Sequence, residues 1–332
     1  MLFNNSNFIV TNSKISKFRN LVNLLEKGRQ TNGYHDAGVN TAQFNPADKG
    51  DTFATGSDDF HIKIWSFNDG ELLNDLSEGH DKPIYTLAYN NTGDYLLSGG
   101  LDKRILHWNL NRSKKNKLRP HNFSVEAIVF SPDFQFFVST SRDLSWKLWN
   151  YNNNNPKEIY KIPHGHFSYI MSAAFSPDGN NLITGSFDRE IRLWKVENGE
   201  RLKIFEAAKT DDKKKKSSGS HEKSIVKVAW SLSNTIASID VDGIVKIWTP
   251  EGDETKSFVA HKGGNHLEFS FDGSKLVTSG EDGLVHVWDT NTFSKINTFA
   301  ADGLNIKVAT INPNGTRLVY GDESGRIFMA EI

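Results

Sequence analysis

The stretch Thr184–Trp194 reads TGSFDREIRLW, and it decides the fold because five variants of it occur elsewhere in the chain. It opens on a hydroxyl residue, carries an aspartate six residues before its end and closes on a tryptophan. The variants are TGSDDFHIKIW, SGGLDKRILHW, STSRDLSWKLW, SIDVDGIVKIW and TSGEDGLVHVW, which end at Trp65, Trp108, Trp149, Trp248 and Trp288. A histidine precedes each tryptophan by roughly thirty residues, and the whole unit recurs every 40 to 54 residues or so, as in repeat proteins.

Each unit therefore supplies one His, one Ser or Thr, one Asp and one Trp. The six sets are His35, Thr55, Asp59, Trp65; His80, Ser98, Asp102, Trp108; His121, Ser139, Asp143, Trp149; His166, Thr184, Asp188, Trp194; His221, Ser238, Asp242, Trp248; and His261, Thr278, Asp282, Trp288. Ser, His and Asp also form catalytic triads, but a triad occurs once per site, whereas this set occurs six times with Ser and Thr interchanged. We interpret each set as a structural tetrad, in which the carboxylate, imidazole, hydroxyl and indole are joined by hydrogen bonds. We expect no catalytic residue among them.

Three short runs of alternating apolar residues lie between each histidine and its tryptophan, and a fourth follows. In the unit of Trp194 they are IMSAAFS, LITGS, REIRLW and GERLKIF, separated by turn residues such as PDGNN. Runs of four to seven residues split by Pro, Asp, Gly and Asn predict an antiparallel four-stranded meander. Helical periodicity is absent from these units.

The repeated unit resembles the WD40 repeat over residues 35–332. The resemblance implies an all-β fold, a seven-bladed propeller with four antiparallel strands in each blade. A seventh unit aligns at the C-terminal end but departs from the pattern at each marker. It has Asp302 for His, Tyr320 for Ser or Thr, Ser324 for Asp and Ala330 for Trp. Its fourth strand is lacking, and the resemblance implies that a segment before the first repeat supplies it.

Two N-terminal segments could complete the seventh blade. Asn7–Thr11 (NFIVT) has the better strand composition and is the preferred choice, whereas residues 20–30 lie closer to the first blade. Between them, Lys14–Lys27 has apolar residues at helical spacing, with Ser13 as N-cap and Gly28 just past the end, which predicts an amphipathic helix. The expected organisation is an N-terminal extension, 1–34, and a propeller, 35–332.

Composition excludes several functions. The 332 residues carry 39 Lys+Arg and 40 Asp+Glu, so bulk charge does not bind the chain to nucleic acid or membrane. There is no cysteine, which excludes disulfides and Cys-ligated metals, and no phosphate-binding loop or nucleophile elbow occurs. We expect no cofactor and no metal; the pair His164 and His166 lacks an acidic third ligand. No apolar run is long enough for a membrane span. These features favour the cytoplasm or nucleus, with an organellar transit peptide left open by the Ser- and Lys-bearing N-terminus.

The rim of the ring is the expected interaction surface. On the end that carries His and Asp, the residue before each repeat Asp and those just after each repeat His should face outward. The candidate protein-interaction residues are Lys82, Leu101, Phe123, Arg142, Tyr169 and Phe187. Aromatic residues and Arg dominate interface energetics, so blades 2–4 are the expected contact area.

The sequence therefore favours a non-enzymatic scaffold or adaptor subunit that binds other proteins or peptides on its loop face, as a monomer within a larger complex. The alternative is a subunit of an RNA- or chromatin-associated assembly whose basic loops contact phosphate. Two basic stretches are candidates, Lys213–Lys216 and the connection Arg112–Arg119. An enzyme that uses the central channel is disfavoured, because the residues expected to face the channel are mostly apolar. They are Val39, Ile84, Val125, Ile170, Ile225 and Ile306, with Asn265 as the exception.

Overall fold

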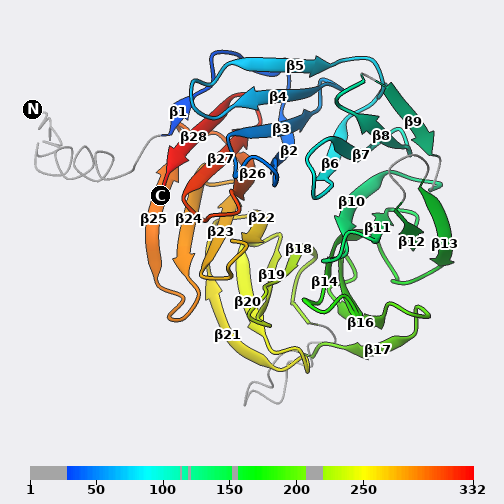
Figure 1. Ribbon diagram of the computed structural model, residues 1–332. Helices are drawn as coiled ribbons and strands as arrows, with labels where there is room; N and C mark the ends of the chain where they lie inside the picture. The colour runs from blue at the N-terminus through cyan, green and yellow to red at the C-terminus, as the bar shows by residue number, and fades with distance from the viewer. Residues whose placement is uncertain (1–27, 113, 119–120, 152–155, 207–219) are drawn as a thin grey trace, which may run out of the picture.

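Seven four-stranded antiparallel sheets stand around a central channel in the computed structural model (Figure 1). It describes residues 28–112, 114–118, 121–151, 156–206 and 220–332. The first strand of each sheet is the innermost, because these strands contact one another in sequence around the ring. This is the seven-bladed all-β propeller that the repeats predict.

The blades follow one another along the chain. Blades 1 to 3 are β2 (Val39–Phe44), β3 (Thr52–Ser57), β4 (Ile62–Ser66) and β5 (Leu72–Leu76); β6 (Ile84–Tyr89), β7 (Tyr95–Gly100), β8 (Ile105–Asn109) and β9 (Lys114–Leu118); and β10 (Val125–Phe130), β11 (Phe136–Ser141), β12 (Trp146–Asn150) and β13 (Lys157–Ile162). Blades 4 to 6 are β14 (Ile170–Phe175), β15 (Asn181–Ser186), β16 (Ile191–Lys195) and β17 (Arg201–Ile204); β18 (Ile225–Trp230), β19 (Ile236–Asp240), β20 (Ile244–Trp248) and β21 (Glu254–Val259); and β22 (Gly264–Phe269), β23 (Lys275–Gly280), β24 (Leu284–Asp289) and β25 (Lys295–Ala300). Blade 7 is β26 (Ile306–Ile311), β27 (Arg317–Asp322), β28 (Ile327–Glu331) and β1 (Arg29–Gln30).

The strand that completes blade 7 is β1, which pairs Arg29 with Met329 and Gln30 with Phe328 on β28. The preference for Asn7–Thr11 was therefore wrong, and the outer position falls to the end of the alternative segment, 20–30. The backbone N–H of Gly28 donates to the Tyr320 hydroxyl at 3.0 Å, which fixes the chain beside β28. Asn7–Thr11 and the expected helix Lys14–Lys27 lie outside the described residues.

Adjacent blades are packed closely because a glycine of one blade receives a β-branched residue of the next. A Cβ added to Gly185 would lie 2.7 Å from Val228 and 2.9 Å from Ile225, and one on Gly321 would lie 2.6 Å from Val39. Gly56 and Gly99 are in the same situation. Val39, Ile84, Val125, Ile170, Ile225 and Ile306 are all fully buried. They do not face the channel, so the expectation of an apolar channel lining was wrong.

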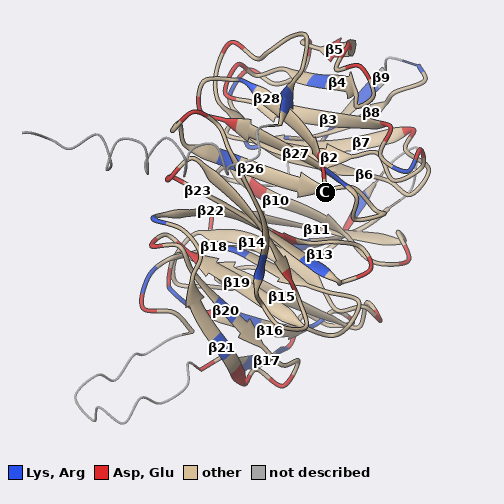
Figure 2. Ribbon diagram, turned by 90° about the vertical axis from the view of Figure 1, so that its left-hand side faces the viewer, with Lys and Arg blue, Asp and Glu red and all other residues tan. Residues whose placement is uncertain are grey.

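Many acidic residues lie on loops and at strand ends, whereas several basic residues lie within strands, among them Lys63 on β4, Lys246 on β20 and Lys256 on β21 (Figure 2). The basic residues from Lys114 to Lys117 form the outer strand β9 rather than the connection expected for them, and Lys213–Lys216 lie outside the described residues. In the described part of the chain there is no helix long and apolar enough to cross a membrane.

Candidate functional site

The tetrad of blade 4 is assembled as the sequence predicts. His166 donates from Nδ1 to the Asp188 carboxylate at 2.9 Å, and its Nε2 lies 2.7 Å from the Thr184 hydroxyl. The hydroxyl oxygen accepts from Trp194 Nε1 at 2.8 Å. Asp188 also accepts the backbone N–H groups of Phe167 and Glu190, which ties the loop before β14 to the turn before β16.

Four further sets repeat this geometry, with the imidazole bonded to the carboxylate, the hydroxyl bonded to the imidazole and the indole donating to the hydroxyl. They are the sets of His35, His80, His121 and His261. Each hydroxyl is fully buried, donates its proton to the imidazole and accepts the indole N–H, so it is inaccessible to a substrate. The arrangement stiffens a blade and offers no nucleophile.

Blade 5 departs from the expected set. The acidic partner of His221 is Asp240, at 2.9 Å, and not Asp242, which is about half exposed and lies 3.9 Å from Lys223. Asp240 also accepts the N–H groups of Asp242 and Ile244. The assignment of Asp242 to the tetrad was therefore wrong. Asp240 stands at the position of Ser57, Ser141 and Ser186 in blades 1, 3 and 4, and its longer side chain contacts the imidazole of His221.

Blade 7 replaces the tetrad with a different set of contacts. Tyr320, at the hydroxyl position, stacks on Phe328 with ring centroids 5.0 Å apart. Asp322 is fully buried and accepts from Arg326 Nε at 2.7 Å and from the Ser324 hydroxyl at 2.7 Å. An aromatic stack and an ion pair thus hold together the blade that lacks histidine and tryptophan.

The protonation states follow from burial and hydrogen bonding. Burial alone would raise the pKa of Asp188, but the hydrogen bond from His166 and those from the backbone outweigh it and hold the pKa below its usual value. Burial lowers the pKa of His166 in spite of the carboxylate beside it. In the tetrad of blade 4, a neutral imidazole therefore lies between an ionised carboxylate and a hydroxyl near neutral pH.

Among the described residues, two groups of side chains have the composition of a metal site, and both make other interactions. In the first, the rings of His261 and His286 are stacked 4.6 Å apart and inclined by 11°, so their in-plane lone pairs do not converge on one point, and Lys295 lies 3.2 Å from His286 Nε2. In the second, Glu190 beside His166 and Asp188 is bound by Arg192 at 2.6 Å.

His107 lies outside the tetrads, on β8, and is buried against Tyr95 with ring centroids 4.9 Å apart. Burial lowers the pKa of His107 to about 4, against 6.5 when unfolded. Because the unfolded chain binds this proton first, stability is lost as the pH falls below about 6.5. We expect His107→Phe to reduce, by about 2 kcal/mol, the loss of unfolding free energy between pH 7 and pH 5. Urea unfolding at both pH values measures this, and an unchanged loss would contradict it.

Three of the six predicted rim residues contact one another, and the other three do not join them. Arg142 lies 5.4 Å from the ring centre of Tyr169, and Tyr169 lies 5.9 Å from Phe187. Phe123 is 56 % exposed and stands apart under Lys103. Lys82 and Leu101 are exposed on loops of blade 2.

Sequence reasoning missed two aromatic residues on this rim. The ring centre of Tyr85 lies 5.8 Å from the Arg142 guanidinium, which is therefore within cation–π distance of two rings. Glu126 pairs with Arg142 at 2.8 Å. Phe167 is 82 % exposed and covers Arg192 at 4.9 Å. We name Tyr85, Arg142, Tyr169 and Phe187 the rim patch. Tyr85 directly follows Ile84 at the start of an inner strand, a position that the repeat pattern does not mark.

The seven-bladed ring and its repeated tetrads define a WD-repeat β-propeller. Residues 39–331 match the family described as the first beta-propeller of IFT122, and the chain belongs to this family.

Curated relatives share parts of the propeller. The chain is 27 % identical over 258 residues to the protein tipD of Dictyostelium discoideum, covering 75 % of this chain and 40 % of tipD. It is 30 % identical over 117 residues to polyadenylation factor subunit 2 of Candida albicans, and 25 % identical over 137 residues to a subunit of chromatin assembly factor 1 from Gallus gallus. Each of these two alignments covers 35 % of this chain, and 21 % and 24 % of the relative. The chain thus spans two fifths or less of these relatives.

Proposed function

We propose that the chain is a non-enzymatic scaffold subunit that binds other proteins through the rim patch. The observation that carries this proposal is the unbroken series of contacts Tyr85–Arg142–Tyr169–Phe187 across three neighbouring blades. Contacts with aromatic rings restrict the Arg142 side chain before binding, so less conformational entropy is lost when a partner binds. Aromatic residues and Arg are also the commonest energetic anchors of interfaces. Membership in a WD-repeat family, two of whose relatives are named as subunits of larger factors, supports the same function.

The double variant Arg142→Ala/Phe187→Ala tests the proposal. We expect it to recover about tenfold less partner protein than the wild type in affinity purification, because the patch loses its arginine and one of its three rings. Quantitative mass spectrometry of the bound proteins is the measurement. The matched control is Glu281→Ala/Glu323→Ala, which changes two rim residues on blades 6 and 7. Equal recovery by both double variants, with unchanged thermal unfolding, would argue against the patch.

The second candidate is a subunit of an RNA- or chromatin-associated assembly, favoured by the names of the polyadenylation and chromatin-assembly relatives. Its physical basis here is β9, on which Lys115 and Lys117 are exposed. Contacts between such lysines and phosphates would give an affinity that falls steeply with salt. Fluorescence anisotropy with labelled RNA and DNA at two salt concentrations separates this candidate from the scaffold, which predicts no such binding.

A further inference from the structure

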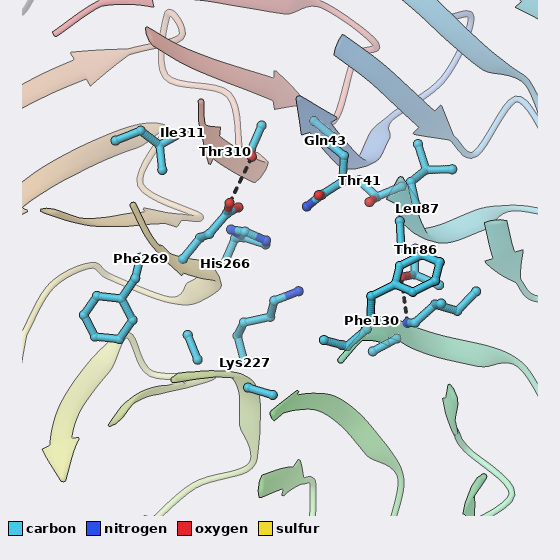
Figure 3. Close-up of a pocket in the computed structure, with 18 of the residues that line it drawn as sticks. Thr41, Gln43, Thr86, Leu87, Phe130, Lys227, His266, Phe269, Thr310 and Ile311 are labelled. Carbon is cyan, nitrogen blue, oxygen red and sulfur yellow. Dashed lines mark hydrogen bonds between the residues drawn. The ribbon is translucent and has the colours of Figure 1, made fainter. Parts of the chain in front are cut away.

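The channel contains a cavity of about 450 Å³ that is lined by both polar and apolar residues. Its lining comes from the inner strands of several blades. Lys227 on β18, His266 on β22 and Thr310 on β26 lie on one side, and Thr41 and Gln43 on β2 lie on the other (Figure 3). Apolar residues complete the lining, among them Ile128, Phe130, Phe269 and Ile311.

Two opposite charges in this cavity are left without an ion pair in the described part of the chain. Lys307, also on an inner strand, pairs with Asp58 at 2.7 Å, and Glu126 pairs with Arg142 at 2.8 Å. Lys227 has no comparable partner, and its amine extends into the open middle of the channel (Figure 3). Among the described residues, Glu268 accepts a hydrogen bond from the Thr310 hydroxyl alone, at 3.3 Å.

His266 adds a third unsatisfied group. It is 8 % exposed, and its Nδ1 is buried without a hydrogen-bond partner. Burial, together with the nearby Lys227, keeps its pKa well below the usual value, so the ring is neutral. Burial also lowers the pKa of Lys227 and raises that of Glu268, and the attraction between these two charges opposes both shifts without cancelling them. Unsatisfied polar groups around a cavity are typical of a binding site rather than of a structural core.

From this geometry we propose that the channel binds a small zwitterion, an apolar α-amino acid, between Lys227 and Glu268. The carboxylate of the ligand accepts from Lys227, and its ammonium donates to Glu268 and to His266 Nδ1. The apolar side chain lies against the aliphatic and aromatic lining. This inference is independent of the rim patch.

The charge pattern selects this class over its neighbours. A simple carboxylate would satisfy Lys227 but would be repelled by Glu268, and a simple amine would be repelled by Lys227. A molecule with both charges a few ångströms apart satisfies both groups, and its own desolvation is compensated at each end. Replacing either Lys227 or Glu268 by an uncharged residue would remove one of the two charge interactions with the ligand and leave the other.

Isothermal titration calorimetry on the full chain tests the proposal with L-leucine and L-phenylalanine as probes. Each is paired with analogues that lack one charge: 4-methylpentanoate and 3-methylbutylamine for leucine, 3-phenylpropanoate and 2-phenylethylamine for phenylalanine. We expect at least one amino acid to bind, and its two analogues to bind at least about tenfold more weakly.

Two variants assign the binding to the channel. We expect Lys227→Met and Glu268→Gln each to weaken the binding by about tenfold or more. Lys223→Met and Glu281→Gln, which make the same changes on the exposed loops of the same two blades, should leave it unaltered. Thermal unfolding verifies that each variant is folded. Absence of heat with both amino acids, equal binding of an amino acid and an analogue, or binding that survives both channel substitutions would each overturn the proposal.

Discussion

Asp240→Ala is expected to lower the free energy of unfolding by about 2–3 kcal/mol. Asp240 is 2 % exposed and accepts three hydrogen bonds, from His221 Nδ1 and from the N–H groups of Asp242 and Ile244. Alanine cannot accept any of them, so the buried imidazole and two turn amides lose their partner. The cost then extends along the tetrad, because His221 orients the Ser238 hydroxyl that accepts from Trp248. Equilibrium unfolding in urea measures the change.

Asp242→Ala is the matched control, since it makes the same substitution at the aspartate two residues later in the chain. Asp242 is about half exposed and lies 3.9 Å from an exposed lysine, so its loss should change the free energy of unfolding by no more than about 0.5 kcal/mol. The sequence pattern alone predicts the opposite order, because Asp242 holds the repeat position. Equal effects of the two substitutions, or a larger effect of Asp242→Ala, would show that the pairing of His221 with Asp240 is not what stabilises blade 5.

The blades and five of the six tetrads could be predicted because each rests on several residue types that recur at fixed spacing. A buried indole, hydroxyl, imidazole and carboxylate satisfy one another, so the pattern constrains geometry as well as chemistry. In blade 5 the repeat pattern could not decide which aspartate pairs with His221, since Asp240 and Asp242 lie two residues apart next to the same turn. The available signal was that Asp240 replaces a serine found in blades 1, 3 and 4.

The channel could not be predicted because simple alternation fails on the inner strands. A register shift follows the first residue of these strands, for example between Ile225 and Lys227 and between Gly264 and His266. This bulge turns the first residue into the space between blades and the later residues toward the channel. The sequence analysis assigned residues at the start of the inner strands, such as Ile225, to the channel, whereas the structure places later residues such as Lys227 and Glu268 in it. The closing strand was misassigned for a different reason. β1 is only two residues long, so strand propensity gives little signal, and the hydrogen bond from Gly28 to Tyr320 holds the chain beside β28.

Gly321→Val is expected to destabilise the ring where it closes, by about 3 kcal/mol or more. Gly321 lies on β27 of blade 7 and faces Val39 on the inner strand of blade 1. An added Cβ would stand 2.6 Å from the Val39 Cβ and 2.7 Å from its Cγ1. Val39 is fully buried and β-branched, so it has no alternative rotamer space, and the two blades must move apart. The measured quantity is again the free energy of unfolding in urea.

Thr140→Val is the control at the equivalent position of blade 3, as the registers show: Thr140 opposes Ala127, and Gly321 opposes Val308. Here the interface already holds a β-branched side chain, and its hydroxyl is buried without a hydrogen-bond partner. Replacing that hydroxyl by a methyl group of the same shape should leave the stability unchanged or raise it by about 1 kcal/mol. The same valine is therefore expected to be harmless between blades 3 and 4 and costly between blades 7 and 1. If both variants unfold at the same urea concentration, the close glycine contact is not what determines ring closure.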